Sequence, residues 1–420
     1  HHMASGKAGD AVYGVEPPPT AKKLRELFYM AHFVHSHIAH FYALAAPDFV
    51  VGPTAAKAER NILGVINKVG VNIGTEVIKQ RRIAQEIQAL IGGHQTHVVM
   101  NIPGGVRKGL TEEQRADIEK KAKGFIDFAK FSLNLFGDVV LENKEYVDLI
   151  LNGPYSLKLH SMGLVDENNK VNFYDGKVRV VDTEGEEHCK YSPNDYQDFV
   201  AERVEPWSYL KFPYLKKIGW KGFVEGQDSG VYQATPLSRL NAADGMATPF
   251  AQSEYEKMFG ILGGKPVHAT LAMHWARLIE LLYSAERSLE LATDPDIIGK
   301  DLRSPLPNIP NEGIGIVEAQ RGTLTHHYIT DDKGLVLKAN LIVGTTNNNA
   351  AICMSLKKAA QGLIKKGVEV TDGILNMIEM AFRAYDPCFS CATHSLPGEM
   401  PMIVNIREMD GTLIRTVKRK

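Results

Sequence analysis

Four long segments with the features of helices constrain the fold of this 420-residue chain most strongly. One of them begins with a capping box at Thr111–Gln114, in which side chains satisfy the first free backbone N–H groups of a helix. Apolar residues recur at helical spacing along the segments and must be buried against another element. The sequence therefore predicts a core of packed helices, formed by residues 20–46, 53–93, 111–131 and 268–292.

Three other segments have alternating apolar residues and turn dipeptides, which are typical of antiparallel strands. We expect a hairpin over residues 171–181 around Asp175-Gly176, strands over 314–346 around Asp332-Lys333-Gly334, and a last hairpin over 402–417. We find no internal repeat and no low-complexity linker. The predicted fold class is therefore α+β and mainly helical, a single large domain whose helical bundle core carries small β-sheet insertions.

Charge and hydropathy exclude two classes of protein. The chain has 48 basic and 49 acidic residues, a formal net charge of -1, whereas a protein that binds nucleic acid over its whole surface is strongly basic. No apolar run reaches the roughly 18 residues that cross a bilayer. Four cysteines are too few for a disulfide scaffold in a chain of this length. We expect a cytoplasmic protein without a nucleic-acid partner or a membrane span.

The densest group of reactive side chains lies in the segment Asp386–His394, DPCFSCATH. Cys388, Cys391 and His394 fall within seven residues of it, on a loop behind Pro387. The Cys-x-x-Cys spacing lets two thiolates bind one soft or borderline metal ion. A thioredoxin-type redox motif would begin a helix after a strand, whereas this motif follows a predicted helix. We therefore predict a metal site.

The other two cysteines do not complete this site. Cys353 lies in an apolar helical run, where a lone cysteine is usually a small buried hydrophobe. Cys189 lies beside a charged turn, and we predict no metal role for it. A tetrahedral thiolate site needs two further soft ligands. We expect these ligands to come from scattered residues or to lie outside this sequence.

The motif resembles the DPCxxCxxH motif of nickel-iron hydrogenase large subunits. Residues 318–327 (EAQRGTLTHH), 340–349 (NLIVGTTNNN) and 36–49 are also similar to segments of that family. The resemblance covers almost the whole chain and is greatest to the cytoplasmic, cofactor-coupled group of the methyl-viologen-reducing type. It implies the large-subunit fold and the reversible, heterolytic cleavage of dihydrogen into protons and electrons.

The resemblance also implies the cofactors and their ligands. These are a nickel-iron centre, with cyanide and carbon monoxide on the iron, and a magnesium or iron ion near the C-terminal histidine. Cys388 would be a terminal nickel ligand, and Cys391 would bridge the two metals. His394 would bind the magnesium ion.

Four further residues acquire roles from the resemblance. Arg321 would lie over the open position between the metals, paired with Asp386 and Asp48. The Thr345 hydroxyl would donate to a cyanide nitrogen. Gln320 stands where the family has a proline, which adds an amide beside this arginine.

The two ends of the sequence fit the same family. The sequence begins HHMAS, and the family's N-terminal CGxCxxxH motif often continues in this way, so we expect His1 to be the motif's histidine and two cysteines to lie upstream of it. We expect a catalytic domain over residues 1–394 and a propeptide over 395–420 that a maturation protease removes. Electrons would pass to an iron-sulfur small subunit, since the chain has too few cysteines for a cluster, and further electron-transfer subunits are compatible with this.

Two other hypotheses use the same residues differently. The chain could be a non-catalytic relative, like the respiratory complex I subunit that has lost the cysteines, although Cys388, Cys391 and His394 are present here. It could instead be a structural zinc protein with those three residues as ligands. The four histidines of residues 32–40 could bind a metal in pairs, but we predict that they are hydrogen-bonded within the helical core.

Overall fold

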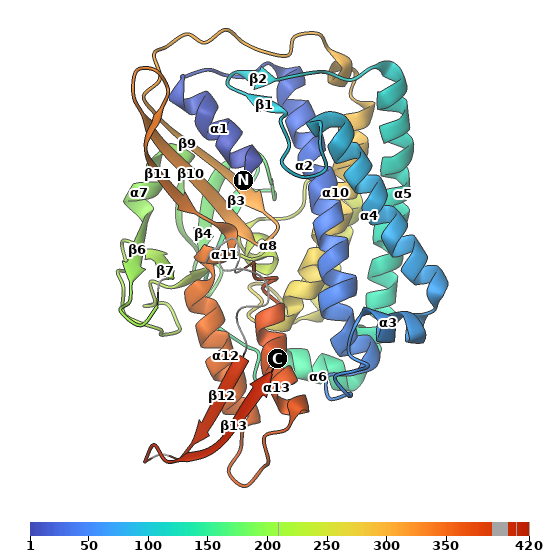
Figure 1. The fold of residues 1–420 in the computed structure, drawn as a ribbon, viewed down its shortest axis with the longest axis vertical. Helices are drawn as coiled ribbons and strands as arrows, with labels where there is room; N and C mark the ends of the chain where they lie inside the picture. Colours follow the sequence, from blue (N-terminus) through green and yellow to red (C-terminus); the bar gives the residue numbers. More distant parts are fainter. Residues whose placement is uncertain (209, 389–401, 409, 420) are drawn as a thin grey trace.

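The computed structural model describes residues 1–208, 210–388, 402–408 and 410–419. Helices predominate, as the sequence predicts, and most of them lie in a bundle (Figure 1). The helices are α1 His2–Val12, α2 Pro19–His40, α3 Ile62–Val69, α4 Val71–Gly92, α5 Glu112–Phe136, α6 Lys144–Asn152, α7 Tyr196–Phe199, α8 Pro236–Ala242, α9 Pro249–Ile261, α10 Met273–Thr293, α11 Gly344–Asn347, α12 Asn349–Leu363 and α13 Asp372–Arg383.

The bundle is built around α10, which packs against α2 and α5, while α4 packs on the other side of α2. Every residue of α10 from Met273 to Glu286 is buried, including three that carry polar or charged side chains at a spacing of three: His274, Arg277 and Glu280. That spacing places these three side chains on one face of the helix. The core of the protein therefore contains a line of polar side chains.

The predicted helix over residues 20–46 ends earlier than expected. After α2 the chain continues as two π-helical turns, η1 Phe41–Ala45 and η2 Pro47–Val51. Pro47 has no backbone N–H and cannot continue an α-helical hydrogen-bond ladder, which explains the change of helix type. The predicted second helix is also divided, at Gly70, whose φ of +97° separates α3 from α4.

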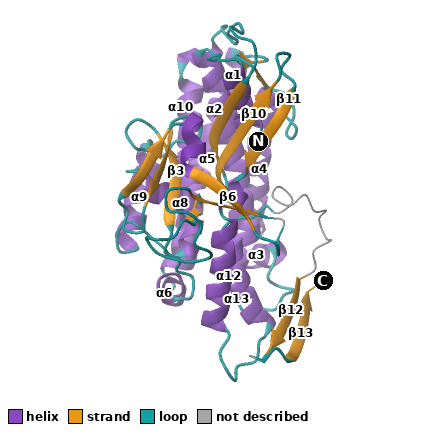
Figure 2. Cartoon of the chain, turned by 90° about the vertical axis from the view of Figure 1, so that its left-hand side faces the viewer, coloured by secondary structure: helices purple, strands orange, loops and turns teal. Residues whose placement is uncertain are grey.

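An antiparallel three-stranded sheet, a mixed four-stranded sheet in which β3 and β8 run parallel, and three two-stranded sheets lie beside the bundle, and Figure 2 shows them in a second view. One sheet has the strand order β11-β10-β9 and is covered by α1, and the other has the order β5-β4-β3-β8. The strands are β1 Asn101–Ile102, β2 Gly105–Val106, β3 His160–Val165, β4 Lys177–Val181, β5 Glu187–Tyr191, β6 Val200–Val204, β7 Lys211–Leu215, β8 Tyr232–Gln233, β9 Glu312–Ala319, β10 Gly322–Thr330, β11 Val336–Ile342, β12 Met402–Arg407 and β13 Leu413–Arg419.

The hairpin predicted over residues 171–181 is wrong in its first half. Strand β4 pairs with β3 and β5, whereas residues 172–174 form no strand. The Asn172 side chain accepts hydrogen bonds from the backbone N–H groups of Tyr174 and Asp175, which bends the chain instead of extending it. The strands predicted around Asp332–Gly334 and the hairpin around Asp410-Gly411 are confirmed.

The hairpin β12–β13 is a sheet of its own and pairs with no other strand of the described chain. It lies apart from the body, below α12 and α13 (Figure 2). In the described part of the chain, no helix is long and apolar enough to cross a membrane.

Candidate active site

Four of the residues predicted to form the site are described and lie together. The Arg321 guanidinium donates from Nε to the main-chain carbonyl of Asp386 at 2.7 Å and from Nη2 to its carboxylate at 3.3 Å. The backbone N–H of Cys388 donates to the Thr345 hydroxyl at 3.2 Å. We call Arg321, Thr345, Asp386 and Cys388 the candidate site. Cys391 and His394 lie outside the described residues.

Arg321 is placed by a two-residue turn between β9 and β10, which pair up to Ala319 and Gly322. Gly322 has φ +145°, and a Cβ atom there would lie 2.3 Å from the Ala234 carbonyl oxygen and 2.7 Å from that of Gly344. Only glycine permits this close approach of three backbone segments. The prediction that Gly322 marks a close backbone approach beside Arg321 is confirmed.

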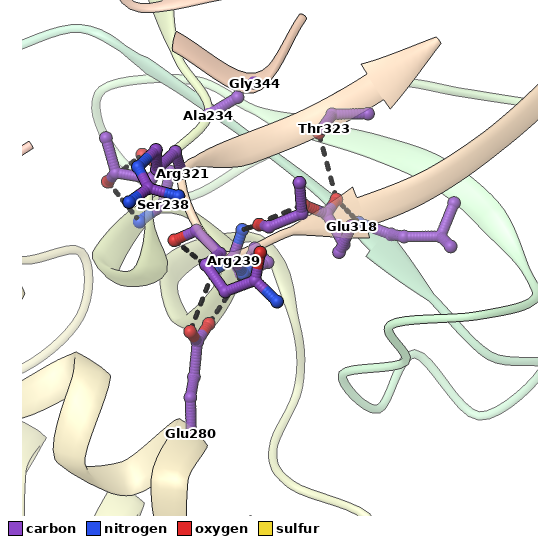
Figure 3. A network of polar contacts seen from close by, with 12 residues as sticks. Ala234, Ser238, Arg239, Glu280, Glu318, Arg321, Thr323 and Gly344 are labelled. Atoms are coloured by element: carbon purple, nitrogen blue, oxygen red, sulfur yellow. Dashed lines mark hydrogen bonds and ion pairs between the residues drawn. The ribbon is translucent and has the colours of Figure 1, made fainter. Parts of the chain in front are cut away.

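A buried ion-pair network fixes the strand end that leads into Arg321 (Figure 3). Arg239 of α8 donates to both carboxylate oxygens of Glu280 at 2.6 and 2.7 Å, and to Glu318 at 3.0 Å. It also donates to the carbonyl of Ala319 at 2.8 Å. All three charged side chains are fully buried, so the network depends on complete pairing.

Sequence analysis missed this network, although a signal for it exists. Arg239 and Glu280 are charged residues inside otherwise apolar helical segments, LSRLNA and ARLIELL. A charge in the interior stripe of a helix is rarely buried unless it is paired. The sequence alone does not show that the two helices meet.

Asp386 is held in an unusual backbone position. Its φ is +51° and its side chain is almost fully buried. Burial raises the pKa of the Asp386 carboxyl, and the positive charges of Arg321 and Arg277 act against that rise. One carboxylate oxygen, Oδ2, is buried and has no hydrogen-bond partner among the described residues.

Asp48 does not pair with Arg321, and that prediction is wrong. Its carboxylate accepts hydrogen bonds from Arg383 Nε and Nη2, both at 3.0 Å, and from Asn376 at 3.0 Å. The π-helical turn η2 directs Asp48 toward α13, whose last residue is Arg383. Asp48 therefore anchors the end of the helix that leads into Asp386.

The four histidines of α2 are hydrogen-bonded as predicted. His37 Nε2 contacts Glu280 at 2.9 Å and His40 Nε2 donates to the Arg383 carbonyl at 2.8 Å, while His32 and His35 contact Gln88 and Arg81. Burial lowers the pKa of His37 to about 4, which keeps its imidazole neutral at pH 7. Within the described residues, no group of three or more histidine, cysteine or acidic side chains is placed to hold a metal ion.

The cysteines differ in their surroundings. Cys189 and Cys353 are free, partly buried and located in β5 and α12, and burial raises the pKa of the Cys189 thiol to about 11. Cys388 is disulfide-bonded. Binding of a metal by Cys388 requires its reduced, thiolate form.

A cavity of about 610 Å³ lies elsewhere, between α1 and β9, and is lined by residues such as Lys7, Tyr174 and Glu312. None of the candidate-site residues lines it. This cavity is therefore not part of the candidate site.

Comparison with known proteins gives a consistent set of relatives. Residues 1–68 and 149–394 match the family model of the nickel-dependent hydrogenases. The chain is 48% identical to an iron-sulfur subunit of the F420-non-reducing hydrogenase of Archaeoglobus profundus, over 100% of this chain and 86% of that protein. It is 36% identical to the beta subunit of the NAD-reducing hydrogenase HoxS of Cupriavidus necator, over 99% of this chain and 85% of the relative.

Solved structures agree with these relatives. The crystal structure of an NAD+-reducing [NiFe]-hydrogenase in the H2-reduced state has a TM-score of 0.87 at 36% identity, covering 94% of this chain and 85% of that one. The Ni-Fe-Se hydrogenase of D. vulgaris Hildenborough in the reduced state has a TM-score of 0.70 at 23% identity, covering 93% and 86%. The second likeness concerns the fold.

Proposed function

The chain belongs to the nickel-dependent hydrogenase family, and we propose that Arg321, Thr345, Asp386 and Cys388 form its described share of a nickel-iron centre. As a hydrogenase large subunit it is an oxidoreductase that acts on dihydrogen. The observation that carries the site proposal is the convergence of Arg321, from the β9–β10 turn, with Asp386 and Cys388 of the cysteine motif.

The donors and acceptors of the candidate site fit such a centre. Cys388 offers a soft sulfur ligand when reduced, which suits nickel. The Thr345 hydroxyl accepts from the Cys388 N–H, so its own hydrogen stays available for another acceptor. Within the described chain, the buried nitrogens of Arg277 and the Gln320 Nε2 also lack partners. A set of buried, unused donors suits a group that carries anionic ligands such as cyanide.

The bound centre supplies the metal chemistry that splits dihydrogen heterolytically. The protein residues hold charged groups at fixed positions around the centre and provide an acceptor for the proton. Arg321 keeps a permanent positive charge at the site, and its contacts with Asp386 fix the plane of the guanidinium. A terminal Cys388 thiolate can accept the proton at Sγ. Cys391 would be a further thiolate ligand of the centre and His394 would bind a magnesium or iron ion, and both residues lie outside the described part of the chain.

Both relatives are named as single subunits of a hydrogenase, which implies partner subunits. We propose that the electrons pass to an iron-sulfur small subunit. An iron-sulfur cluster takes about four cysteine ligands, and only Cys189 and Cys353 remain here, in separate elements. One relative is NAD-reducing, and this soluble acceptor supports a location in the cytoplasm. We also propose that a maturation protease removes residues 395–420.

Metal analysis of the purified hydrogenase complex tests the proposal. We expect both nickel and iron in the large subunit and hydrogen-dependent reduction of a dye. Cys388→Ser should remove nickel and activity, because a hard oxygen replaces a soft sulfur. Cys353→Ser is the matched control and should keep both. Zinc alone, or no metal in a folded complex, would show that the site has another function.

A further inference from the structure

Arg277 of α10 is a buried guanidinium without a partner in the described chain. Its side chain is fully buried, and Nε, Nη1 and Nη2 each lack a hydrogen-bond acceptor among the described residues. Arg25 is equally buried, but its Nη groups donate to Asp10 and to the carbonyls of Ile102 and Gly105. A buried charge without a partner is strongly unfavourable. Arg277 therefore requires an acceptor that the described residues do not supply.

Two of the charges that act on Arg277 belong to residues of the candidate site, Asp386 and Arg321. Asp386 acts on it most strongly among the attractive charges, followed by Glu280, while Arg239 and Arg321 repel it. Glu280 is already bonded by Arg239 and His37, whereas Asp386 keeps a buried oxygen without a described partner. Arg277 and Asp386 therefore both keep unused hydrogen-bonding capacity where the metal centre is proposed.

The guanidinium groups on this side of the bundle are unevenly paired. Arg239 makes ion pairs with Glu280 and Glu318, and the partly exposed Arg321 pairs with Asp386. No carboxylate of the described residues lies within ion-pair distance of Arg277, whose three nitrogens are buried and without acceptors. Burial lowers the pKa of Arg277 to about 10. An anion would supply the missing acceptor.

We propose that Arg277 is a second guanidinium of the metal site and donates hydrogen bonds to an anionic ligand of the bound metal group. This inference rests on the proposed function, in which cyanide on the iron is that anion. A water molecule could also accept these hydrogen bonds, but it carries no charge to offset the buried guanidinium. Arg277 would then hold and polarise the metal group from α10, while Arg321 contacts it from the β9–β10 turn.

The proposal makes opposite predictions for the metal-free and the metal-loaded protein. Arg277→Met removes the charge at similar volume, and Arg277→Lys keeps the charge but loses the planar fork. Arg25→Met is the matched control, because it removes an equally buried arginine whose partners belong to the protein. Each variant is measured as purified complex and as large subunit in which metal analysis finds neither nickel nor iron, by thermal unfolding and by infrared spectroscopy of iron-bound cyanide.

We expect metal-free Arg277→Met to unfold at a higher temperature than the metal-free wild type, by roughly 2 °C or more, since an unpaired buried charge is removed. The metal-loaded variant should unfold at a lower temperature than its wild type, and its cyanide bands should shift. Arg277→Lys should restore part of the metal content. Arg25→Met should destabilise both forms equally and leave the cyanide bands unchanged.

A loss of stability in metal-free Arg277→Met like that of Arg25→Met would overturn the inference, because the partner would then be a protein group or a bound water. Unshifted cyanide bands in a loaded Arg277→Met complex would overturn it too. The metal content of the wild-type complex distinguishes these results from a failure of the proposed function. If the proposed function is wrong, the wild-type complex will contain no nickel and iron, independently of any change at Arg277.

Discussion

Arg321 holds Asp386 at two points, the main-chain carbonyl at 2.7 Å and the carboxylate at 3.3 Å. The two residues lie 65 positions apart, at the β9–β10 turn and at the start of the cysteine motif. Two donors in one plane are needed to reach a carbonyl and a carboxylate of the same residue, which a guanidinium provides and an ammonium does not. This contact joins the turn to the loop that carries Cys388.

Arg321→Lys should leave the metal content largely intact and lower hydrogen uptake by about 10²–10³-fold, as expected when a preorganised charged donor is lost at a reaction site. Lysine keeps the charge but cannot make both contacts with Asp386. Uptake is measured with an artificial electron acceptor and normalised to nickel. Arg203→Lys is the control, because Arg203 pairs with Glu205 at the surface. Unchanged uptake in Arg321→Lys would make this residue structural.

Gly322→Ala should disrupt the turn that carries Arg321. The added Cβ would lie 2.3 Å from the Ala234 carbonyl oxygen, so the backbone must move. Gly367→Ala is the matched control, since Gly367 also has a positive φ, +80°, but nothing lies within 4 Å of its added Cβ. The control should cost about 1 kcal/mol of unfolding free energy. Gly322→Ala should cost clearly more and lower nickel content, and equal costs would contradict this argument.

Sequence patterns were sufficient for the close backbone approach at Gly322, whereas the metal-ligand role of Cys388 stays a prediction. The turn at Gln320-Arg321-Gly322 and the Cys388 segment each lie within a few residues, and the residue types alone indicate a close backbone approach and a metal ligand. The pairing of Arg321 with Asp386 needed the family resemblance. Nothing local to either segment shows that they meet.

Asp48→Asn tests the ion pair of Asp48 with Arg383, which the structure shows in place of the predicted pair with Arg321. Losing the charge of one partner of this partly buried pair with Arg383 should cost about 1–3 kcal/mol of unfolding free energy. In a double-mutant cycle with Arg383→Met, the two costs should not add, because both changes remove the same contact. A parallel cycle with Arg321→Met should be additive. Coupling of Asp48 to Arg321 instead would restore the original prediction.

The pairing of Asp48 with Arg383 could not be predicted from the sequence, for a physical reason. Asp48 follows Pro47 in a π-helical turn, and a change from α to π geometry rotates every later side chain on the helix. Helical spacing therefore points Asp48 in the wrong direction. The Arg239 network was missed because its members come from α8, α10 and β9, which only the tertiary fold brings together.

His274→Gln should flatten the pH dependence of stability. Burial lowers the pKa of His274 to about 3 in the folded protein, against about 6.5 when unfolded. Between these values only the unfolded chain binds the proton, so this contribution is complete above pH 6.5 and is lost as the pH falls. From pH 7 to pH 5 the wild type should lose about 2 kcal/mol more than the variant. The measurement is urea unfolding of the metal-free large subunit.

The exposed residue His94 provides the control for this experiment. His94→Gln should follow the wild-type pH profile, because its side chain is solvated in both the folded and the unfolded chain. Equal pH slopes for wild type and His274→Gln would show that His274 is protonated in the folded core.

The final prediction is that residues 395–420 are removed from the mature protein. The hairpin β12–β13 pairs only with itself among the described strands, and its ion pair between Arg415 and Glu369 joins two exposed side chains, which contributes little. Its loss should therefore leave the helical core stable. Mass spectrometry of the large subunit from active enzyme should find a C-terminus at His394, and the protein from nickel-starved cells should keep the hairpin. An active, nickel-loaded protein that still ends at Lys420 would contradict the prediction.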